Sequence, residues 1–373
     1  MTGTAGKTIL HLIDTTGPGG AETVFISLLG KLEETEFQNV VVLRGEGWVA
    51  DQVRGLGITP HIIDSKGSFN LAYIRALRHI LNCQQVDLIH AHLLGSNVYG
   101  ALLAIISRTP MIATFHGAVD VSAGERFLRA KFSIIGWGAS AIVCVSKRLQ
   151  DELAERSPLP KHKLKLIYNG VNPEIFRRVP VTELREELGV SQEATLVVSI
   201  GNVRPAKGYE YLVDAAVSMA ELDPNTHFVV VGHQREALFD KLKTQIAEAP
   251  RQPNIHWLGF RQDAADVLRQ ADIFLLPSVS EGFSISTVEA MMAGVPVIAT
   301  RSGGPEEIIV NGETGLLVPI RDPDAIVAAI LDLKRTVLHK EVTERAHERA
   351  CDQFSLASML QGYFGLYERL MAH

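Results

Sequence analysis

The sequence predicts an α/β fold made of two domains, each built on a doubly wound parallel sheet. Its 373 residues correspond to two domains at the usual size of roughly 100–200 residues each. Short β-branched runs alternate with longer helical patterns, an order typical of βαβ units and of parallel sheets covered on both faces. The alternation occurs twice, before and after a polar stretch around residues 177–192.

The first series predicts a domain over residues 1–175. Its expected strands are Thr8–Asp14, Asn39–Leu43, Thr59–Ile63, Leu88–His90, Met111–Phe115, Ala141–Val145 and Leu164–Ile167. Helical patterns lie between them, for example over Glu22–Leu32, Leu71–Asn82 and Leu94–Ser107.

The second series predicts a domain over residues 176–355, with the hinge near Pro173–Pro180. Its expected strands are Thr195–Ile200, His227–Val231, Ile255–Leu258, Ile273–Pro277, Pro296–Thr300 and Gly315–Val318. Its expected helices include Tyr209–Leu222, Arg235–Glu248, Asp263–Gln270 and Thr287–Ala293. Residues 356–373 contain a further helical pattern with no strand after it, which we expect to cross back over the hinge toward the first domain.

Charge and cysteine content limit the classes of partner and compartment. The net charge of −6 is uneven, with 19 basic and 15 acidic residues over positions 1–180 and 17 basic and 27 acidic residues after them. A mildly basic half fits an anionic partner such as a membrane face, and it fits a chance imbalance of solvated charges equally well. A nucleic-acid partner is not expected, because the basic residues are neither numerous nor clustered enough. Three widely spaced cysteines argue for a reducing compartment.

Targeting signals are not recognised in the sequence. The apolar run Ile9–Ile13 is too short for a signal peptide, and no stretch approaches the ~20 apolar residues that span a bilayer. We therefore expect a cytoplasmic protein, with peripheral contact at the inner face of the cell membrane as an open alternative.

The stretch Glu281-Gly-Phe-Ser-Ile-Ser-Thr-Val-Glu289 is the most informative candidate site. It follows a predicted strand and runs into a predicted helix, where backbone N–H groups point toward a bound anion. In an open α/β sheet the ligand binds at the carboxyl ends of the strands. Glu281 and Glu289 can accept hydrogen bonds from sugar hydroxyls there, or they are simply a helix-start charge and a solvated face.

A second candidate loop, Gly201-Asn-Val-Arg-Pro-Ala-Lys-Gly208, also connects a strand to a helix. The guanidinium of Arg204 and the ammonium of Lys207 are suited to phosphate oxygens. Fixed positive charge aimed at a leaving diphosphate lowers the barrier to its departure. The alternative is a basic loop on a solvated rim.

Weaker candidates lie in the first half. Gly17-Pro-Gly-Gly20 follows the first strand and lets a backbone approach a phosphate, or it is an ordinary tight turn. His116 ends a predicted strand. It is either a site residue or a residue packed against the sheet.

No metal site is predicted. His90 and His92 share a strand face, but no third ligand is evident in the sequence. Asp322-Pro-Asp324 is interpreted as a helix cap.

Taken together, these segments resemble the GT-B glycosyltransferases of glycosyltransferase family 4 over nearly the whole chain. The matching segments are Gly19-Gly20-Ala-Glu22, Asp87-Leu-Ile-His-Ala-His92, Thr114-Phe-His-Gly117, Val145-Ser146, Asn169-Gly170-Val171, the loop at 201–208, Ala271–Ser278, the two-glutamate motif, Ala293–Thr300, Gly303-Gly304 and Gly312–Pro319. The resemblance implies two Rossmann-like domains facing across a cleft, no cofactor and a retaining transfer of a hexose-type sugar from a UDP- or GDP-sugar. The implied acceptor is a glycan or lipid-linked molecule in cell-surface polysaccharide or glycolipid biosynthesis.

The resemblance also implies roles for particular residues. Lys207 and a nearby arginine, Arg204, would hold the diphosphate, and Glu281 and His116 would lie at the donor sugar. Donor-binding residues would be Gly19, Gly20, Asn202, Phe283, Ser284, Ile285 and Glu289. Two positions depart from the family pattern: Asn202 stands where the family often has arginine, and Ser284 where it often has glycine.

Other functions are compatible with parts of this pattern. A nucleotide-sugar epimerase or a glycan phosphorylase shares the architecture, a dinucleotide-binding oxidoreductase would need a different glycine spacing, and a catalytically silent binding module would not need the charged residues. The apolar and basic stretch from Arg126 to Trp137 fits a helix packed on the sheet, which we favour, or a membrane-surface segment presenting a lipid-linked acceptor.

Overall fold

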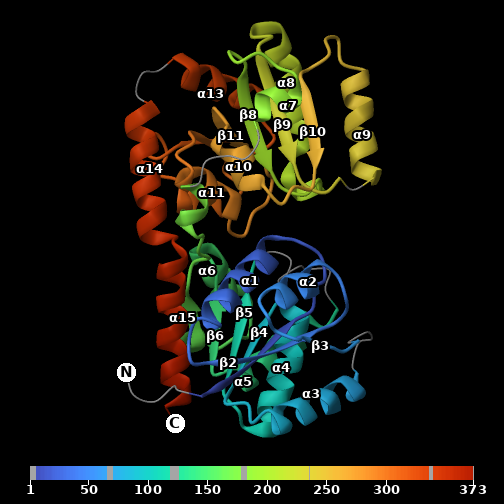
Figure 1. The fold of residues 1–373 in the computed structure, drawn as a ribbon, viewed down its shortest axis with the longest axis vertical. Coiled ribbons are helices and arrows are strands. Elements are labelled where there is room, and N and C mark those ends of the chain that lie inside the picture. The colour runs from blue at the N-terminus through green and yellow to red at the C-terminus, as the bar shows by residue number, and fades with distance from the viewer. Residues whose placement is uncertain are drawn as a thin grey trace. The chain divides into compact units, whose positions relative to one another are not determined.

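The computed structural model describes residues 6–64, 70–117, 126–177, 183–234, 236–335 and 339–372. The chain divides into two compact units, one formed by residues 1–170 with 356–373 and the other by residues 171–355. Each unit is an α/β layer structure with a parallel sheet flanked by helices, as the sequence predicts (Figure 1).

The first unit contains a seven-stranded sheet in the order β3-β2-β1-β4-β5-β6-β7. Its strands are β1 (Thr8–Ile13), β2 (Gln38–Leu43), β3 (His61–Ile62), β4 (Leu88–His92), β5 (Met111–Phe115), β6 (Ala141–Cys144) and β7 (Leu164–Leu166). Its helices are α1 (Gly20–Leu32), α2 (Trp48–Gly55), α3 (Leu71–Cys83), α4 (Leu94–Ser107), α5 (Leu128–Gly138), α6 (Lys147–Arg156) and α15 (Leu356–Met371). The last of these, α15, contacts β4 and α1.

The second unit contains a six-stranded sheet in the order β10-β9-β8-β11-β12-β13. Its strands are β8 (Thr195–Ile200), β9 (Thr226–Val231), β10 (Ile255–Gly259), β11 (Ile273–Leu276), β12 (Val297–Thr300) and β13 (Leu316–Val318). Its helices are α7 (Leu184–Leu188), α8 (Tyr209–Leu222), α9 (Glu236–Ala247), α10 (Ala264–Arg269), α11 (Ile285–Met292), α12 (Pro305–Ile308), α13 (Pro323–Arg335) and α14 (His339–Gln353). Arg235, where one helix is expected to begin, lies outside the described residues.

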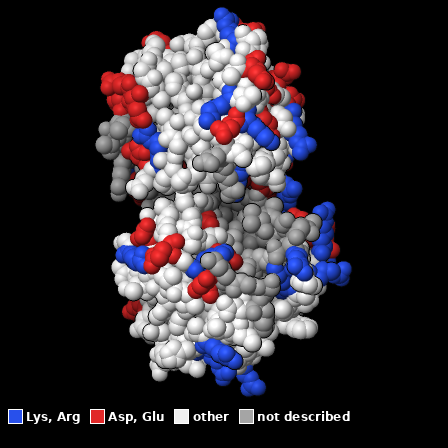
Figure 2. All heavy atoms as spheres, turned by 90° about the vertical axis from the view of Figure 1, so that its right-hand side faces the viewer, with Lys and Arg blue, Asp and Glu red and all other residues white. Residues whose placement is uncertain are grey.

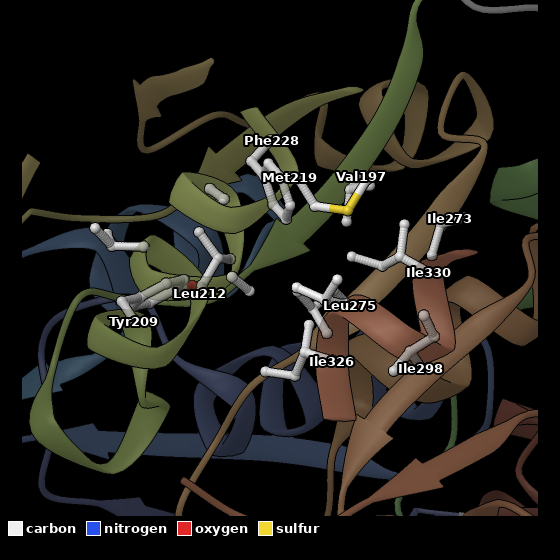
Figure 3. Close-up of a cluster of buried hydrophobic side chains, with 14 of the residues drawn as sticks. Val197, Tyr209, Leu212, Met219, Phe228, Ile273, Leu275, Ile298, Ile326 and Ile330 are labelled. Atoms are coloured by element: carbon white, nitrogen blue, oxygen red, sulfur yellow. The ribbon is translucent and has the colours of Figure 1, made fainter. Parts of the chain in front are cut away.

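The core of the second unit shows why its strands are continuous apolar runs. Strands of a parallel sheet covered on both faces bury both sets of side chains. Val197 and Phe228 from the sheet, with Leu212 and Met219 from α8, form one buried cluster, which α13 extends through Ile326 and Ile330 (Figure 3). Burial of each such side chain contributes roughly 1.5–3 kcal/mol. The hydrophobic effect therefore holds α8 and α13 against the sheet.

Local signals set several helix starts. The Asn70 side chain accepts a hydrogen bond from the backbone N–H of Tyr73 at the start of α3. Asp322 accepts one from the N–H of Ala325 at 3.0 Å, which confirms its interpretation as the cap of α13. Each cap satisfies an N–H that the helix itself leaves unpaired.

Surface charge is mixed on both units. On the face drawn in Figure 2, Lys and Arg side chains are interspersed with Asp and Glu side chains, and no broad patch of one sign covers either unit. No helix in the described ranges is long and apolar enough to cross a membrane.

Candidate functional site

The strand order of the second sheet defines a candidate position for a ligand site. From β8 the chain continues through β9 and β10 on one side, and β11, β12 and β13 lie on the other side. The loops after β8 and β11 therefore diverge at a topological switch point, where open α/β sheets bind their ligands. The two candidate motifs of this half, residues 201–208 and 281–289, follow those two strands.

Lys207 and Glu281 form an ion pair at this switch point. Lys207 Nζ lies 2.6 Å from Glu281 Oε1, and the side chains are only 12% and 8% exposed. The Ser278 hydroxyl donates to the same carboxylate oxygen at 2.6 Å. Low exposure strengthens a charge-assisted hydrogen bond because little water screens it. The structure thus brings together two residues that the sequence analysis placed in separate loops.

Gly208 is required for the close approach of these loops. Its φ is +62°, in the left-handed region, and a Cβ atom there would lie 2.2 Å from the carbonyl oxygen of Pro277. Any other residue would strain the backbone and push the loop after β8 away from the loop after β11. Gly208 therefore sets the position of the neighbouring Lys207.

Tyr209 is a further residue at this candidate site, and the sequence analysis did not name it. Its hydroxyl donates to the carbonyl of Gly201 at 2.7 Å, and burial and the nearby Glu281 raise the pKa of Tyr209. A Cβ at Gly201 would lie 3.2 Å from Cε of Lys207, so the lysine stem passes over this glycine. The sequence offers no signal for this role, because Tyr209 is simply the first residue of an amphipathic helix.

Arg204 and Asn202 differ in the contacts that their side chains make. Arg204 is exposed, and in the described part of the chain its guanidinium forms neither a hydrogen bond nor an ion pair. Asn202 Oδ1 accepts a hydrogen bond from the backbone N–H of His233 at 3.0 Å, which ties the loop after β8 to the loop after β9. The guanidinium is therefore available to a ligand, whereas this amide oxygen is occupied.

Ser284 is the N-cap of α11. Its hydroxyl oxygen accepts hydrogen bonds from the backbone N–H of Thr287 at 3.4 Å and from the Thr287 hydroxyl at 2.8 Å. Ser284 is buried, and so is Phe283, whose ring packs edge-on against Phe354 with 5.6 Å between centroids. Ile285 begins the helix. The serine at the position where glycine is common therefore stabilises the helix start.

Glu289 lies on α11 in a partly buried position. Burial raises the pKa of Glu289 to about 7. Among the residues whose structure is described, none pairs with its carboxyl group through a hydrogen bond or an ion pair. Glu289 is partly buried by exposed area, and carboxyl groups with a raised pKa are concentrated at functional sites.

A flat aromatic surface lies at the same edge of the second sheet. The His233 ring, after β9, stacks on the Phe260 ring, after β10, with 4.7 Å between centroids and 4° between planes. The sequence analysis missed this pair. Its signal is a ring-bearing residue shortly after each of two neighbouring strands, but only the sheet order shows that they meet.

In the first unit, the switch point lies between β1 and β4. Gly19 is the N-cap of α1, and Gly20 is its first residue. A Cβ at Gly19 would lie 2.5 Å from Glu22 Oε2, so the Glu22 carboxylate occupies the space that the glycine leaves beside the helix start. The two glycines leave the backbone at the helix start accessible to an anion. The Glu22 side chain must first adopt another conformation, because its carboxylate occupies the space in front of that backbone.

His116 lies directly after β5 and is held by His92. The two rings are stacked with 5.4 Å between centroids, and His92 Nδ1 lies 3.1 Å from His116 Nε2. Burial lowers the pKa of His116 to about 4 and the pKa of His92 well below its ordinary value. Both imidazoles are therefore neutral near pH 7.

His11 joins His90 and His92 in a buried cluster. Each of the three offers a ring nitrogen within 4.8 Å of the others, because His11 on β1 is in register with His90 on β4. The sequence showed only the pair on β4. His90 already uses both nitrogens, toward the Tyr367 and Thr114 hydroxyls at 2.8 and 2.9 Å. A metal would have to break one of these hydrogen bonds.

Comparison with known proteins assigns the chain to a family. The model for "Glycosyltransferase Family 4" matches residues 18–175, and the model for "Glycosyl transferases group 1" matches residues 180–349. A crystal structure of Anabaena HepE in complex with UDP and glucose is similar with a TM-score of 0.88, at 22% identity, over 97% of this chain and 100% of that chain. The fold and the family models together define an enzyme of the glycosyltransferase class with the two-domain GT-B fold.

The chain belongs to glycosyltransferase family 4. It is 28% identical over 308 residues to N-acetyl-alpha-D-glucosaminyl L-malate synthase of Bacillus anthracis, covering 80% of this chain and 79% of that protein. It is 22% identical over 301 residues to UDP-Gal:alpha-D-GlcNAc-diphosphoundecaprenol alpha-1,3-galactosyltransferase of Escherichia coli, covering 78% of each. These matches do not favour a nucleotide-sugar epimerase.

Proposed function

We propose that this glycosyltransferase is a retaining, metal-independent enzyme that moves a hexose-type sugar from a UDP- or GDP-sugar to a glycan or lipid-linked acceptor. The observation that carries the proposal is the Lys207–Glu281 pair, 2.6 Å apart at the switch point of the second sheet. A cation beside a carboxylate there matches a ligand that is anionic at its phosphates and hydroxyl-rich at its sugar.

The diphosphate binds to Lys207 and Arg204 in this proposal. The ammonium of Lys207 is a point charge, and the Glu281 carboxylate holds it in place. The apolar stem of the lysine side chain passes over Gly201. The exposed guanidinium of Arg204 offers two parallel donors to phosphate oxygens. As the bond from the sugar to the phosphate breaks, negative charge grows on the leaving diphosphate, and these cations stabilise it most in the transition state.

The carboxyl groups bind hydroxyls. Glu281 keeps one oxygen on Lys207 and Ser278, which leaves its second oxygen for the donor sugar. Glu289 is unpaired among the described residues, and two vicinal ribose hydroxyls would supply the hydrogen bonds that its carboxyl group lacks. Backbone N–H groups at Phe283, Ser284 and Ile285, at the start of α11, add donors beside the sugar and phosphate.

In this proposal the base of the nucleotide packs against the stacked rings of His233 and Phe260. Phe260 is 39% exposed, and its ring partner His233 is tied to the Asn202 loop by a backbone hydrogen bond. The structure of Anabaena HepE contains UDP and glucose, which supports a uridine nucleotide as the first donor to test.

The chemistry needs no protein nucleophile. The bond between C1 of the sugar and the phosphate oxygen breaks, the acceptor oxygen forms a bond to C1 on the same face, and the acceptor proton passes to the leaving phosphate. His116 lies at the donor sugar in this proposal, and the Gly19-Gly20 backbone approaches the distal phosphate. Because Lys207 and Arg204 supply the positive charge, a divalent cation is not required.

A membrane-linked acceptor is supported by α5. Phe132 and Ile135 are buried, as expected for a helix packed on the sheet, but Phe127 and Trp137 are 72% and 78% exposed. Arg126 lies over the Phe127 ring at 5.4 Å. Exposed aromatic side chains beside basic residues are typical of helices that contact an anionic membrane surface. The E. coli relative acts on a diphosphoundecaprenol-linked sugar.

One experiment tests the proposal as a whole. Purified enzyme is screened by thermal shift against UDP- and GDP-hexoses, because a ligand that binds only the folded state raises its apparent stability. The stabilising donor is then incubated with glycan and polyprenyl-diphosphate-sugar acceptors, and the product anomer is determined by NMR. We expect released nucleoside diphosphate and an elongated acceptor with the donor's anomeric configuration, unchanged by EDTA. An inverted product would reject retention, and activity abolished by EDTA would reject metal independence.

A further inference from the structure

We propose that Ser278 is a positioning residue that orients the Glu281 carboxylate toward the donor sugar. Its hydroxyl donates to Glu281 Oε1, the oxygen that Lys207 also holds, so that Oε2 alone remains to accept hydrogen bonds from a ligand. The inference deepens the proposed function and rests on it, because the ligand of Oε2 is the donor sugar of that proposal.

The direction of the hydrogen bond from Ser278 follows from the atoms around it. Lys207 Nζ and Ser278 Oγ each lie 2.6 Å from Glu281 Oε1. An ammonium group has donors only, so Oε1 accepts in its bond to the lysine. An oxygen that accepts from an ammonium does not carry a carboxyl proton, and the serine must therefore supply its own. The single hydroxyl proton of Ser278 is thus committed to Oε1.

The two donors together fix the plane of the Glu281 carboxylate. A carboxylate oxygen offers about two acceptor sites, and at Oε1 the serine and the lysine occupy both. The carboxylate would lose one of these bonds if its plane turned. Oε2 forms no hydrogen bond among the described residues, although the Glu281 side chain is only 8% exposed. A nearly buried acceptor without a partner is costly, and the hydroxyl of a bound sugar would satisfy it.

The backbone that carries the serine hydroxyl is itself held from two sides. The Thr300 hydroxyl, at the end of β12, donates to the Ser278 carbonyl oxygen. The next N–H along the chain, that of Val279, donates to the Ala206 carbonyl oxygen at 2.9 Å, in the loop after β8. Ser278 and Thr300 are completely buried. Ser278 therefore presents its hydroxyl from a segment that three neighbouring strand ends hold in place.

Ser199 provides a matched contrast. It is as completely buried as Ser278, and it lies on β8, next to β11. Its hydroxyl donates to the Leu275 carbonyl oxygen and so joins two strands of the sheet. Ser278 instead donates its proton to a side chain of the candidate site. Loss of either hydroxyl removes one buried hydrogen bond, but only the loss at Ser278 frees the Glu281 carboxylate.

The arrangement has a consequence for donor specificity. An ionised carboxylate oxygen accepts hydrogen bonds and cannot donate them. The donor sugar must therefore offer a hydroxyl at the position that meets Glu281 Oε2, and a sugar with fluorine at that position loses the bond. Because Ser278 acts on the sugar only through Oε2, its contribution must disappear when that hydroxyl is absent. A serine that only stabilised the fold would not show this coupling.

Calorimetric titration of the full-length enzyme tests the coupling. The ligands are the UDP- or GDP-hexose that the thermal-shift screen selects, each of its monodeoxyfluoro analogues, and the nucleoside diphosphate alone. We expect Ser278→Ala to weaken binding of the complete donor by about three- to tenfold, the value of one hydrogen bond. Binding of the nucleoside diphosphate should stay nearly unchanged, because Glu281 still holds Lys207. With one monodeoxyfluoro analogue, Ser278→Ala and the wild type should bind equally.

Two further variants separate the hydroxyl proton from packing. Ser278→Cys keeps a side chain of similar size, but a thiol is a weak donor, so it should bind the donor as weakly as Ser278→Ala. It also keeps the comparison available if the cavity left by Ser278→Ala prevents folding. Ser199→Ala should bind the donor like the wild type and lower only the thermal stability.

The variants are read together. Equal weakening in Ser278→Ala and Ser199→Ala would show general loosening of the sheet and overturn the proposal. Recovery of donor binding in Ser278→Cys would reduce Ser278 to a packing residue, and the same fold loss with every monodeoxyfluoro analogue would remove the link to Oε2. Failure of the proposed function appears separately, because the wild-type enzyme would then neither bind a nucleotide sugar nor transfer the hexose.

Discussion

Lys207 Nζ and Glu281 Oε1 lie 2.6 Å apart although 74 positions separate them in the chain. The two residues follow neighbouring strands, β8 and β11, and both side chains are nearly buried. The pair is a prepared electrostatic site, because the carboxylate fixes the ammonium before any ligand arrives. Preorganised charge of this kind costs no rearrangement when the reaction occurs.

Removal of the lysine charge is expected to slow transfer strongly. Lys207→Ala should lower kcat by a factor on the order of 10²–10³, because the leaving diphosphate loses its fixed cation. Lys207→Arg should retain part of the rate. Release of nucleoside diphosphate measures the effect, with Lys241→Ala, an exposed lysine of α9, as the control. Wild-type turnover in Lys207→Ala would contradict the assignment.

Donor binding is expected to strengthen between pH 6 and pH 8. The pKa of Glu289 is raised to about 7 by burial, so its carboxyl group is protonated below that pH and ionised above it. The ionised form accepts hydrogen bonds from two hydroxyls, and affinity should rise by up to about tenfold as it forms. Calorimetric titration of a nucleotide sugar at several pH values measures this. Glu289→Gln should bind more weakly at pH 8 and show a flat profile; the same slope in both proteins would exclude Glu289 as the titrating group.

Arg204 is expected to contribute to donor binding but not to the stability of the fold. Its side chain is exposed and forms no ion pair in the described structure. Arg204→Ala should change the free energy of unfolding by less than about 0.5 kcal/mol, and should weaken binding of nucleoside diphosphate. Arg251→Ala, another exposed arginine of the same unit, is the control. Equal binding by both variants would mean that Asn202 or a backbone group takes the place of the family arginine.

Gly208→Ala is expected to destabilise the protein more than the left-handed backbone conformation of this glycine would by itself explain. Gly189 has a similar φ of +65° but nothing near its missing Cβ, whereas a Cβ at Gly208 would lie 2.2 Å from the Pro277 carbonyl oxygen. Gly189→Ala should cost about 1–2 kcal/mol of stability. Gly208→Ala should cost more and should also lower transfer, since the loop carrying Lys207 must move. Denaturant unfolding and turnover of the two variants test this, and equal effects would show that the contact is unimportant.

Membrane contact through α5 is expected to depend on Trp137. The enzyme should float with anionic vesicles but not with zwitterionic ones, and added salt should weaken the association. Trp137→Ala should reduce it. Leu222→Ala, which removes an exposed apolar side chain of the second unit, should not. Absence of wild-type association with anionic vesicles would leave α5 with a packing role only.

The sequence predicts the architecture because its signals are local and periodic. The expected strands of both halves are all present, from β1 at Thr8–Ile13 to β13 at Leu316–Val318. A β-branched run between helical patterns forms a strand in almost any α/β context, and a cap such as Asp322 acts within three residues. The motifs after the strands were found for the same reason, since the carboxyl edge of a parallel sheet is implied by strand direction.

Tertiary structure alone decides how those motifs act. His11 meets His90 only because β1 and β4 pair in that register, and no spacing in the chain encodes it. The stack of His233 on Phe260, the Pro277 carbonyl over Gly208 and the cap made by Ser284 likewise depend on which loops meet.

What the sequence by itself determined is therefore the class of fold, the order of its elements and the family of the enzyme. What only the tertiary structure decided is the state of its side chains: Lys207 fixed by Glu281, a carboxyl group at Glu289 with a pKa of about 7, and His116 neutral beside His92. The physical reason is that secondary structure follows from neighbours along the chain. Protonation and ion pairing follow from burial and from partners that are distant in the sequence.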